Sequence, residues 1–242
     1  MRAEGAVRAG FTLGVALLAV GPACAQTAYG PGGMLVHPGA LVRPKQTWDV
    51  GLSWVEQVRN GKHSEWAPLA VTGGLTDRLE VGAQLIRRRA GTVVSENGGL
   101  FARYRLRDSG EGRPALALVA SHVGGPIALS SLSLASTWSP AGLPKGTLVH
   151  AGIQGALRAD GPTDRSDVRP YVGIQLPIAG PFSLTAEAGA RFRFDPSART
   201  GLGVGWTGAD GRKLTVGWAN TGRAANAGFF VGVGYPIGGG KK

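Results

Sequence analysis

Residues 73 to 89, GGLTDRLEVGAQLIRRR, begin with a turn-forming stretch and continue in strict alternation. From position 79 onward, one face of a predicted strand is apolar and consists of Leu79, Val81, Ala83 and Leu85. The other face is polar or small and consists of Arg78, Glu80, Gly82 and Gln84. Because alternate residues of a strand point to opposite sides, this segment separates an apolar environment from a polar one. The fold depends on whether the apolar side meets protein or lipid.

The first 25 residues have the pattern of a secretory signal peptide. Arg2 and Arg8 precede an apolar run over 11–20, and Ala23-Cys24-Ala25 forms a small-x-small cleavage site. Cleavage after Ala25 lowers the formal charge from +11 to +10 and removes the single cysteine of the chain. The sequence therefore predicts a secreted chain without disulfides.

Alternating segments recur along the rest of the chain, separated by glycine, proline, aspartate and asparagine. About twelve are recognisable by this period-two pattern, near residues 46–56, 65–73, 78–87, 98–107, 113–123, 129–138, 146–157, 168–177, 182–193, 200–207, 212–219 and 225–235. No apolar run after the leader is long enough for a transmembrane helix. We therefore predict an all-β chain that folds as a single up-and-down antiparallel transmembrane β-barrel, with an even strand number typical of outer-membrane barrels.

Aromatic residues at the ends of apolar faces favour lipid as the outer environment. Phe182 and Phe192 bracket the apolar face of the 182–193 segment, about 25 Å apart along the membrane normal at the usual strand tilt. Aromatic residues of the last three segments fall on the same kind of face: Trp206, Trp218, Phe229 and Tyr235. A soluble periplasmic β-sandwich alternates in the same way and is the alternative fold.

The opposite, polar face predicts the lining of the barrel. Its lumen-facing candidates are Arg78, Glu80, Gln84, Arg103, Arg105, His150, Gln154, Arg169, Glu187 and Arg191. The complete predicted face carries a charge of about +6 if every phase is right. Two interpretations follow: a pore that favours anionic solutes by its field, or arginine and carboxylate pairs that fill a small barrel.

The sequence predicts neither an enzyme nor a cofactor. Ser121 and His122 are adjacent and hence point to opposite faces of a strand, so adjacency does not make them a nucleophile and base. His150 has no serine and carboxylate on its face. The chain lacks clustered metal ligands, and no nucleic-acid recognition motif accompanies its basic charge. We therefore expect no catalytic, cofactor-binding or metal site.

The opening GGMLVHPGALVRPKQTWDVGLSW resembles that of YjbH-type outer-membrane proteins through Gly33, Met34, Leu35, Pro38 and Ala40. Three further stretches, GGLTDRLEVGAQL, FARYRLRDSGEGRPALALVAS and NAGFFVGVGY, are similar both to that group and to barrels of the phenol-degradation MetA type. The YjbH resemblance implies a role in exopolysaccharide production or export. The MetA resemblance implies passage of small hydrophobic compounds.

Together these observations predict four segments: a signal peptide (1–25), an N-terminal periplasmic segment (26–45), the barrel (46–235) and a C-terminal tail (236–242). The expected protein is a monomer of the bacterial outer membrane. Its expected partners are outer-membrane lipid, the barrel-assembly machinery and, in the lumen, an anionic polysaccharide or small solutes.

Overall fold

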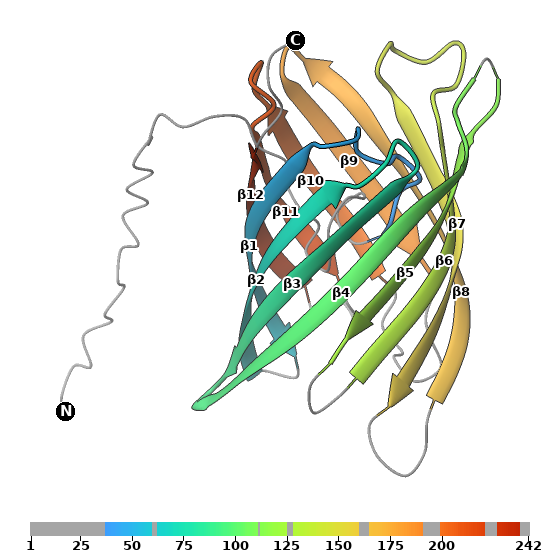
Figure 1. Cartoon of the computed structure of the whole chain (residues 1–242). Helices are drawn as coiled ribbons and strands as arrows, with labels where there is room; N and C mark the ends of the chain where they lie inside the picture. Colours follow the sequence, from blue (N-terminus) through green and yellow to red (C-terminus); the bar gives the residue numbers. More distant parts are fainter. Residues whose placement is uncertain are drawn as a thin grey trace.

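The computed structural model describes residues 37–59, 62–110, 112–124, 128–159, 165–190, 199–220 and 227–237 (Figure 1). Among the residues that the structure describes, no helix has the length and apolarity to cross a membrane. The described strands are β1 (Trp48–Arg59), β2 (Lys62–Gly74), β3 (Leu79–Ala90), β4 (Val93–Arg107), β5 (Ala115–Val123), β6 (Ala128–Trp138), β7 (Leu148–Ala159), β8 (Arg165–Ala179), β9 (Phe182–Gly189), β10 (Arg199–Thr207), β11 (Lys213–Asn220) and β12 (Ala227–Ile237).

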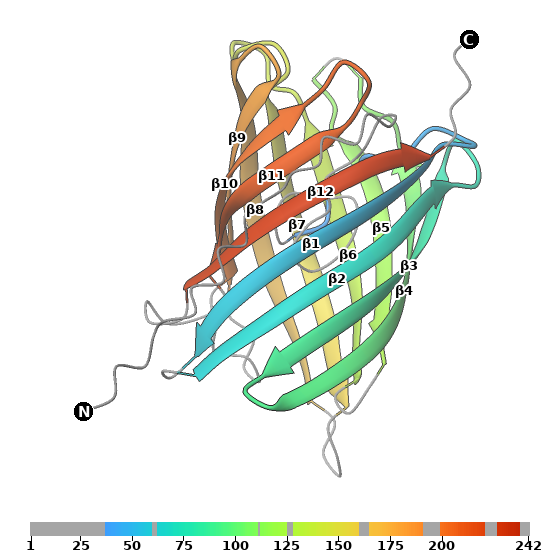
Figure 2. The same ribbon diagram turned by 90° about the vertical axis from the view of Figure 1, so that its left-hand side faces the viewer.

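The strands form one closed antiparallel barrel in which each strand pairs with its neighbours in sequence. The seam is closed by β1 and β12, paired from Trp48 opposite Ile237 to Gln57 opposite Gly228 (Figure 2). The predicted up-and-down barrel is therefore confirmed. The alternative of a β-sandwich is wrong, because a sandwich has open sheet edges whereas this sheet has none.

Several strand ends differ from the predicted ranges. The predicted barrel end at 235 is two residues short, because Pro236 and Ile237 still pair with β1. The stretch between β3 and β4 is a tight hairpin and not a long loop, since only Gly91 and Thr92 separate the strands and Gly91 has a φ of 61°. The predicted signal peptide and the last five residues of the predicted tail lie outside the described residues.

The outer surface is apolar. Large hydrophobic side chains on the outward face are well exposed, including Leu100 at 66% and Leu132 at 58%. Such a continuous apolar surface is unstable in water, and a closed barrel satisfies its own backbone groups in lipid. The protein is therefore a membrane-spanning β-barrel, and the apolar side of the 79–85 strand faces lipid.

Outward aromatic residues lie near both ends of the barrel. Trp54 on β1 makes an edge contact with Phe229 on β12, with ring centroids 6.5 Å apart, and Phe229 in turn contacts Trp218 on β11 at 6.4 Å. Trp48 and Phe182 are exposed toward the other end, where β1 begins and β12 ends. Aromatic rings favour the two membrane interfaces. We name the end that carries both strand termini the terminal end, and the other the distal end.

Candidate functional site: the barrel interior

Residues 37–47 run along the inner wall of the barrel, and we name this segment the inner belt (Figures 1 and 2). It begins at His37, which is buried between β8 and β9. The ring of His37 stacks on Tyr171 with centroids 4.9 Å apart. Its backbone N–H and its ring Nδ1 both lie 3.1 Å from Oε2 of Glu187, as donors to that oxygen. The first residue of the belt is thus held by a carboxylate and an aromatic ring.

The middle of the belt crosses β8 to β4. The Tyr171 hydroxyl donates a hydrogen bond to the carbonyl oxygen of Pro38 at 3.0 Å. The N–H of Ala40 donates to the Thr137 hydroxyl at 2.9 Å, and Arg103 donates to the carbonyl oxygen of Leu41 at 2.8 Å. Ala40 also packs in a buried apolar cluster with Ala115, Ala117, Val119 and Ala135. Small residues on both sides allow this close approach of belt and wall.

The end of the belt reaches β3 and β2 before β1 begins. The N–H of Arg43 donates to Oε2 of Glu80 at 2.9 Å, and the Arg43 guanidinium pairs with Asp49. Gln46 donates from its N–H to the carbonyl oxygen of Gly74 at 2.8 Å. A Cβ on Gly74 would lie 2.2 Å from the Pro44 carbonyl oxygen, so only glycine permits this contact. The belt therefore touches the wall from β9 round to β2.

This location was not predicted from the sequence. The range 26–45 was expected as a periplasmic segment preceding the barrel, whereas its described part, 37–45, lies within the barrel. The belt contacts join residues up to 150 positions apart. Local alternation carries no information about such contacts. One weak signal in the sequence pointed to this packing: Gly39 and Ala40 are small, and so are the inward side chains of β5 and β6 that they approach.

Most predicted lumen residues do lie on the inner face. Buried there are Glu80, Gln84, Arg103, His150, Arg169 and Glu187, and half-buried are Arg105 and Gln154. Arg78 lies outside the strands, exposed in the β2–β3 turn, where its N–H donates to the Thr76 hydroxyl. Arg191 lies outside the described residues.

The inner polar residues are linked in pairs. Arg103 and Glu80 form an ion pair with an N–O distance of 3.1 Å, with side chains 1% and 0% exposed. Arg169 donates from Nε and Nη2 to Oε1 of Gln154 at 3.1 and 2.7 Å. His150 Nδ1 lies 2.9 Å from the Thr137 hydroxyl that also receives the belt N–H. One of these contacts joins an arginine to a carboxylate, and two of the residues, Arg103 and Thr137, also hold the belt.

Two inward residues of β2 and β3 were missed. Trp66 lies on the same face as the buried Thr72, and the guanidinium carbon of its partner Arg88 lies 5.3 Å from its ring centroid. The predicted range of this strand, 78–87, ended before Arg88. Arg88 instead faces inward, because the strand continues to Ala90 and keeps its alternation. Pro68 made it difficult to tell which residues of β2 face inward. Counting back from Thr72 in steps of two nevertheless places Trp66 on the inner face.

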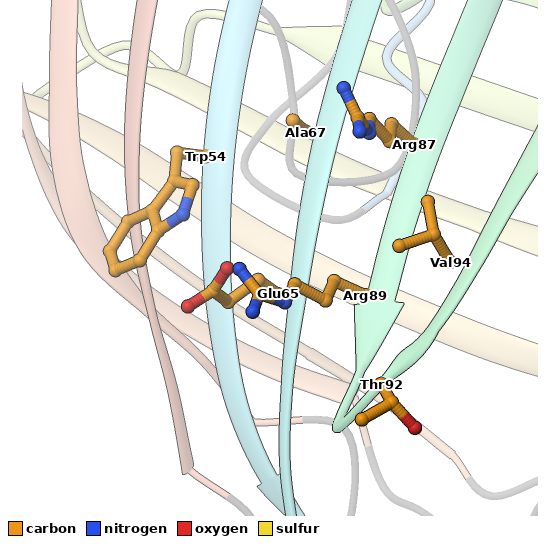
Figure 3. A pocket seen from close by; sticks show the side chains of 7 residues that line it. All are labelled: Trp54, Glu65, Ala67, Arg87, Arg89, Thr92 and Val94. Carbon is orange, nitrogen blue, oxygen red and sulfur yellow. The ribbon is translucent and has the colours of Figure 1, made fainter.

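Arg87 and Arg89 face outward and border a pocket on the lipid side (Figure 3). The pocket has a volume of about 420 Å³ and is lined by Trp54, Glu65, Ala67, Arg87, Arg89, Thr92 and Val94. Figure 3 shows Ala67 between the larger side chains of Trp54 and Arg87. The hollow forms because Ala67 has a much smaller side chain than its outward-facing neighbours, Trp54 and Arg87.

One serine–histidine pair is present on the outer face. Nδ1 of His122 lies 2.9 Å from the hydroxyl of Ser130 on β6, whereas Ser121 bonds Ser131 on the inner side. Among the described residues no carboxylate hydrogen-bonds His122, so the third member that orients a catalytic histidine is not there. The described residues also hold no group of three or more metal-ligand side chains.

No family model and no curated protein sequence matches the chain. The fold is similar to that of the KdgM porin in complex with disordered oligogalacturonate, with a TM-score of 0.60, 10% identity, and coverage of 78% of this chain and 99% of that chain. It is also similar to outer membrane protein Omp33 of Acinetobacter baumannii, with a TM-score of 0.51, 9% identity, and coverage of 82% and 100%. The translocator domain of the autotransporter NalP from Neisseria meningitidis matches with a TM-score of 0.50, 14% identity, and coverage of 81% and 90%.

At these identities the likeness concerns the fold. Together with the lipid-facing outer surface, the fold places the protein in the bacterial outer membrane.

Proposed function

We propose that this protein is an outer-membrane channel for anionic solutes, and that its solutes are acidic saccharides of an exopolysaccharide. The proposal is non-enzymatic and treats the inner belt as the segment that narrows the passage. The terminal end then faces the periplasm, because the strand termini of bacterial barrels lie there.

The observation that carries the proposal is the charge of the inner face. Its described basic residues on the strands are Arg88, Arg103, Arg105, Arg158, Arg169 and Lys213, against the acidic residues Asp49, Glu80, Asp167 and Glu187. The excess is smaller than the +6 of the complete predicted face, since Arg78 lies in the exposed β2–β3 turn and Arg191 is outside the described residues. A narrow lumen with low-dielectric walls still concentrates the remaining positive field and raises the local concentration of anions.

Two further points support acidic saccharides as the solute. The KdgM porin, whose fold this chain shares, was solved with an oligogalacturonate, which is an acidic sugar polymer. The opening residues of the chain resemble those of YjbH-type proteins, whose role is linked to exopolysaccharide. Small hydrophobic compounds, the other class implied by resemblance, fit less well, because charged side chains such as Arg103, Arg169 and Glu187 line the interior beside its apolar residues.

Conductance of the purified protein in planar bilayers tests the channel. We expect anions to carry most of the current, and Arg105→Gln to reduce that preference, because Arg105 is a half-buried inner residue near the terminal end. Arg113→Gln, in the exposed β4–β5 connection, is the matched control and leaves selectivity unchanged. Cation preference in the unaltered protein refutes the anionic channel. Unchanged secretion of acidic polysaccharide from a strain without the protein refutes the exopolysaccharide role.

A cross-link tests the part played by the belt. A Cβ at Gly39 would lie 3.6 Å from the Thr137 hydroxyl oxygen, the position that a cysteine sulfur would take. A small shift therefore brings Gly39→Cys and Thr137→Cys into disulfide geometry. We expect oxidation of this double variant to lower conductance and reduction to restore it. Equal currents under both conditions mean that belt movement does not accompany conduction.

The partners of the proposed channel are outer-membrane lipid, the barrel-assembly machinery and the anionic solute. We propose that it acts as a monomer, since its ring of strands closes within a single chain. A single species of monomer mass in mild detergent is the expected result of light scattering.

A further inference from the structure

Polar and aromatic side chains gather on the inner face of β2, β3 and β4, toward the distal end. Trp66 on β2 is the register partner of Arg88 on β3, and Asn97 on β4 is the partner of Ile86. Gln84 is the partner of Gly99, and this pair lies two residues further along β3 and β4 than the pair of Ile86 and Asn97. Trp66, Arg88, Asn97 and Gln84 are thus neighbours on one patch of the wall, which we name the distal patch.

The geometry of the distal patch is set by two local contacts. The Arg88 guanidinium lies over the Trp66 ring at 5.3 Å, which orients its plane. A Cβ on Gly99 would lie 2.9 Å from Nε2 of Gln84, so the absence of a side chain at position 99 gives the Gln84 amide its space. The guanidinium and the amide therefore have defined positions beside an aromatic ring.

Three polar atoms of this patch are buried and have no hydrogen-bond partner within the described chain. They are Nε of Arg88, Oδ1 of Asn97 and Oε1 of Gln84, and Gln84 as a whole is only 7% exposed. Buried polar atoms without partners are costly, so each of these three atoms calls for a partner from outside the chain, such as a water, an ion or a ligand. On the opposite wall, Gln154 accepts two hydrogen bonds from the Arg169 guanidinium, through Nε and Nη2.

The chemistry of these groups matches one class of ligand. An aromatic face accepts the apolar face of a sugar ring, whereas planar amides bind hydroxyl groups as donors and acceptors. A guanidinium binds a carboxylate with two parallel hydrogen bonds. We propose that Trp66, Arg88, Asn97 and Gln84 form a binding subsite for one acidic sugar unit, on the wall of the passage. This inference rests on the proposed channel function and names where its solute is held.

Block of the bilayer current by trigalacturonate tests the subsite. We expect Trp66→Ala and Arg88→Gln each to raise the half-blocking concentration about tenfold, the loss of one stacking or charged contact. Trp54→Ala and Arg87→Gln are the matched controls, since the same residue types there face lipid (Figure 3). Neutral maltotriose separates the two contributions, because its weaker block depends on Trp66 and not on Arg88.

The outcomes distinguish the subsite from the channel. If the unaltered protein conducts anions but Trp66→Ala and Arg88→Gln leave the trigalacturonate block unchanged, the subsite is refuted and the channel stands. If the unaltered protein does not conduct, the channel is refuted. Calorimetric titration of the detergent-solubilised protein with trigalacturonate then decides on the subsite alone, since binding that Arg88→Gln abolishes supports it and absence of binding overturns it.

Discussion

Replacing Glu187 by glutamine should release the start of the inner belt. The Glu187 carboxylate receives two hydrogen bonds from His37, one from the backbone and one from the ring, both at 3.1 Å. A hydrogen bond to a charged group contributes about 1.5–3 kcal/mol, against about 1 kcal/mol for a neutral pair. Glutamine keeps the shape but loses the charge, so the two bonds together weaken by about 2 kcal/mol. The ratio of seated to released belt then falls about 30-fold.

Single-channel recording measures this ratio as the fraction of time spent in the higher-conductance state. We expect Glu187→Gln to raise the fraction of time spent in the higher-conductance state. The increase reaches about 30-fold if the belt is seated for nearly all of the time in the unaltered protein. Glu65→Gln removes the same charge from the outer face, away from the belt, and leaves the fraction unchanged. Resistance to unfolding in detergent gels verifies that both variants remain barrels.

If folded Glu187→Gln shows the same occupancy of both conductance states as the unaltered protein, the His37 contact does not hold the belt in its closed position. The stacking of His37 on Tyr171 would then be the contact to remove next.

Three further variants test the packing of the wall and its surroundings. Gly82→Ala should destabilise the barrel in urea, because its Cβ would lie 2.0 Å from a carbon of the neighbouring Phe101 ring; Gly98→Ala, with nothing within 4 Å, should be neutral. Arg103→Leu leaves a buried carboxylate without its cation and should cost about 3–5 kcal/mol in the same assay. Arg87→Gln combined with Arg89→Gln should weaken insertion into anionic vesicles by about 1 kcal/mol per arginine and leave zwitterionic vesicles unaffected, measured by protection from protease.

The sequence was informative about the wall because each strand repeats the same two-residue pattern. Trp48, Val50, Leu52 and Trp54 alternate with buried Asp49, Gly51 and Ser53, as period two requires. The alternation identified the inner positions of Glu80 and Glu187 without knowledge of their partners. It did so because lipid and lumen impose opposite demands on successive residues.

The pattern was less informative at strand ends. The predicted range of the fourth strand began at 98, whereas β4 begins at Val93. In the structure Val93 pairs with Ala90, so the hairpin continues past the arginines. Charged side chains mark where a strand leaves the bilayer. Strand pairing depends instead on the β-branched valines and the Gly91 turn, so it can continue beyond the edge of the bilayer.

The belt could not be derived from local pattern at all. Residues 37–47 contain two prolines, Pro38 and Pro44, and lack a periodic face. Their positions are fixed by single contacts with separate strands, each to a partner far along the chain. Such contacts depend on the finished barrel, so they become visible only when the strands are placed in space.

The order of these contacts has a consequence for biogenesis. Arg43 meets Asp49 and Glu80, Leu41 meets Arg103, Ala40 meets Thr137, and His37 meets Glu187 last of all. Moving backward along the belt, each partner belongs to a later part of the chain. The belt can therefore dock only as far as the strands have assembled, and its final contact requires β9. Burial of His37 thus reports that most of the wall has been completed, which makes this residue a natural position for a probe of barrel assembly in living cells.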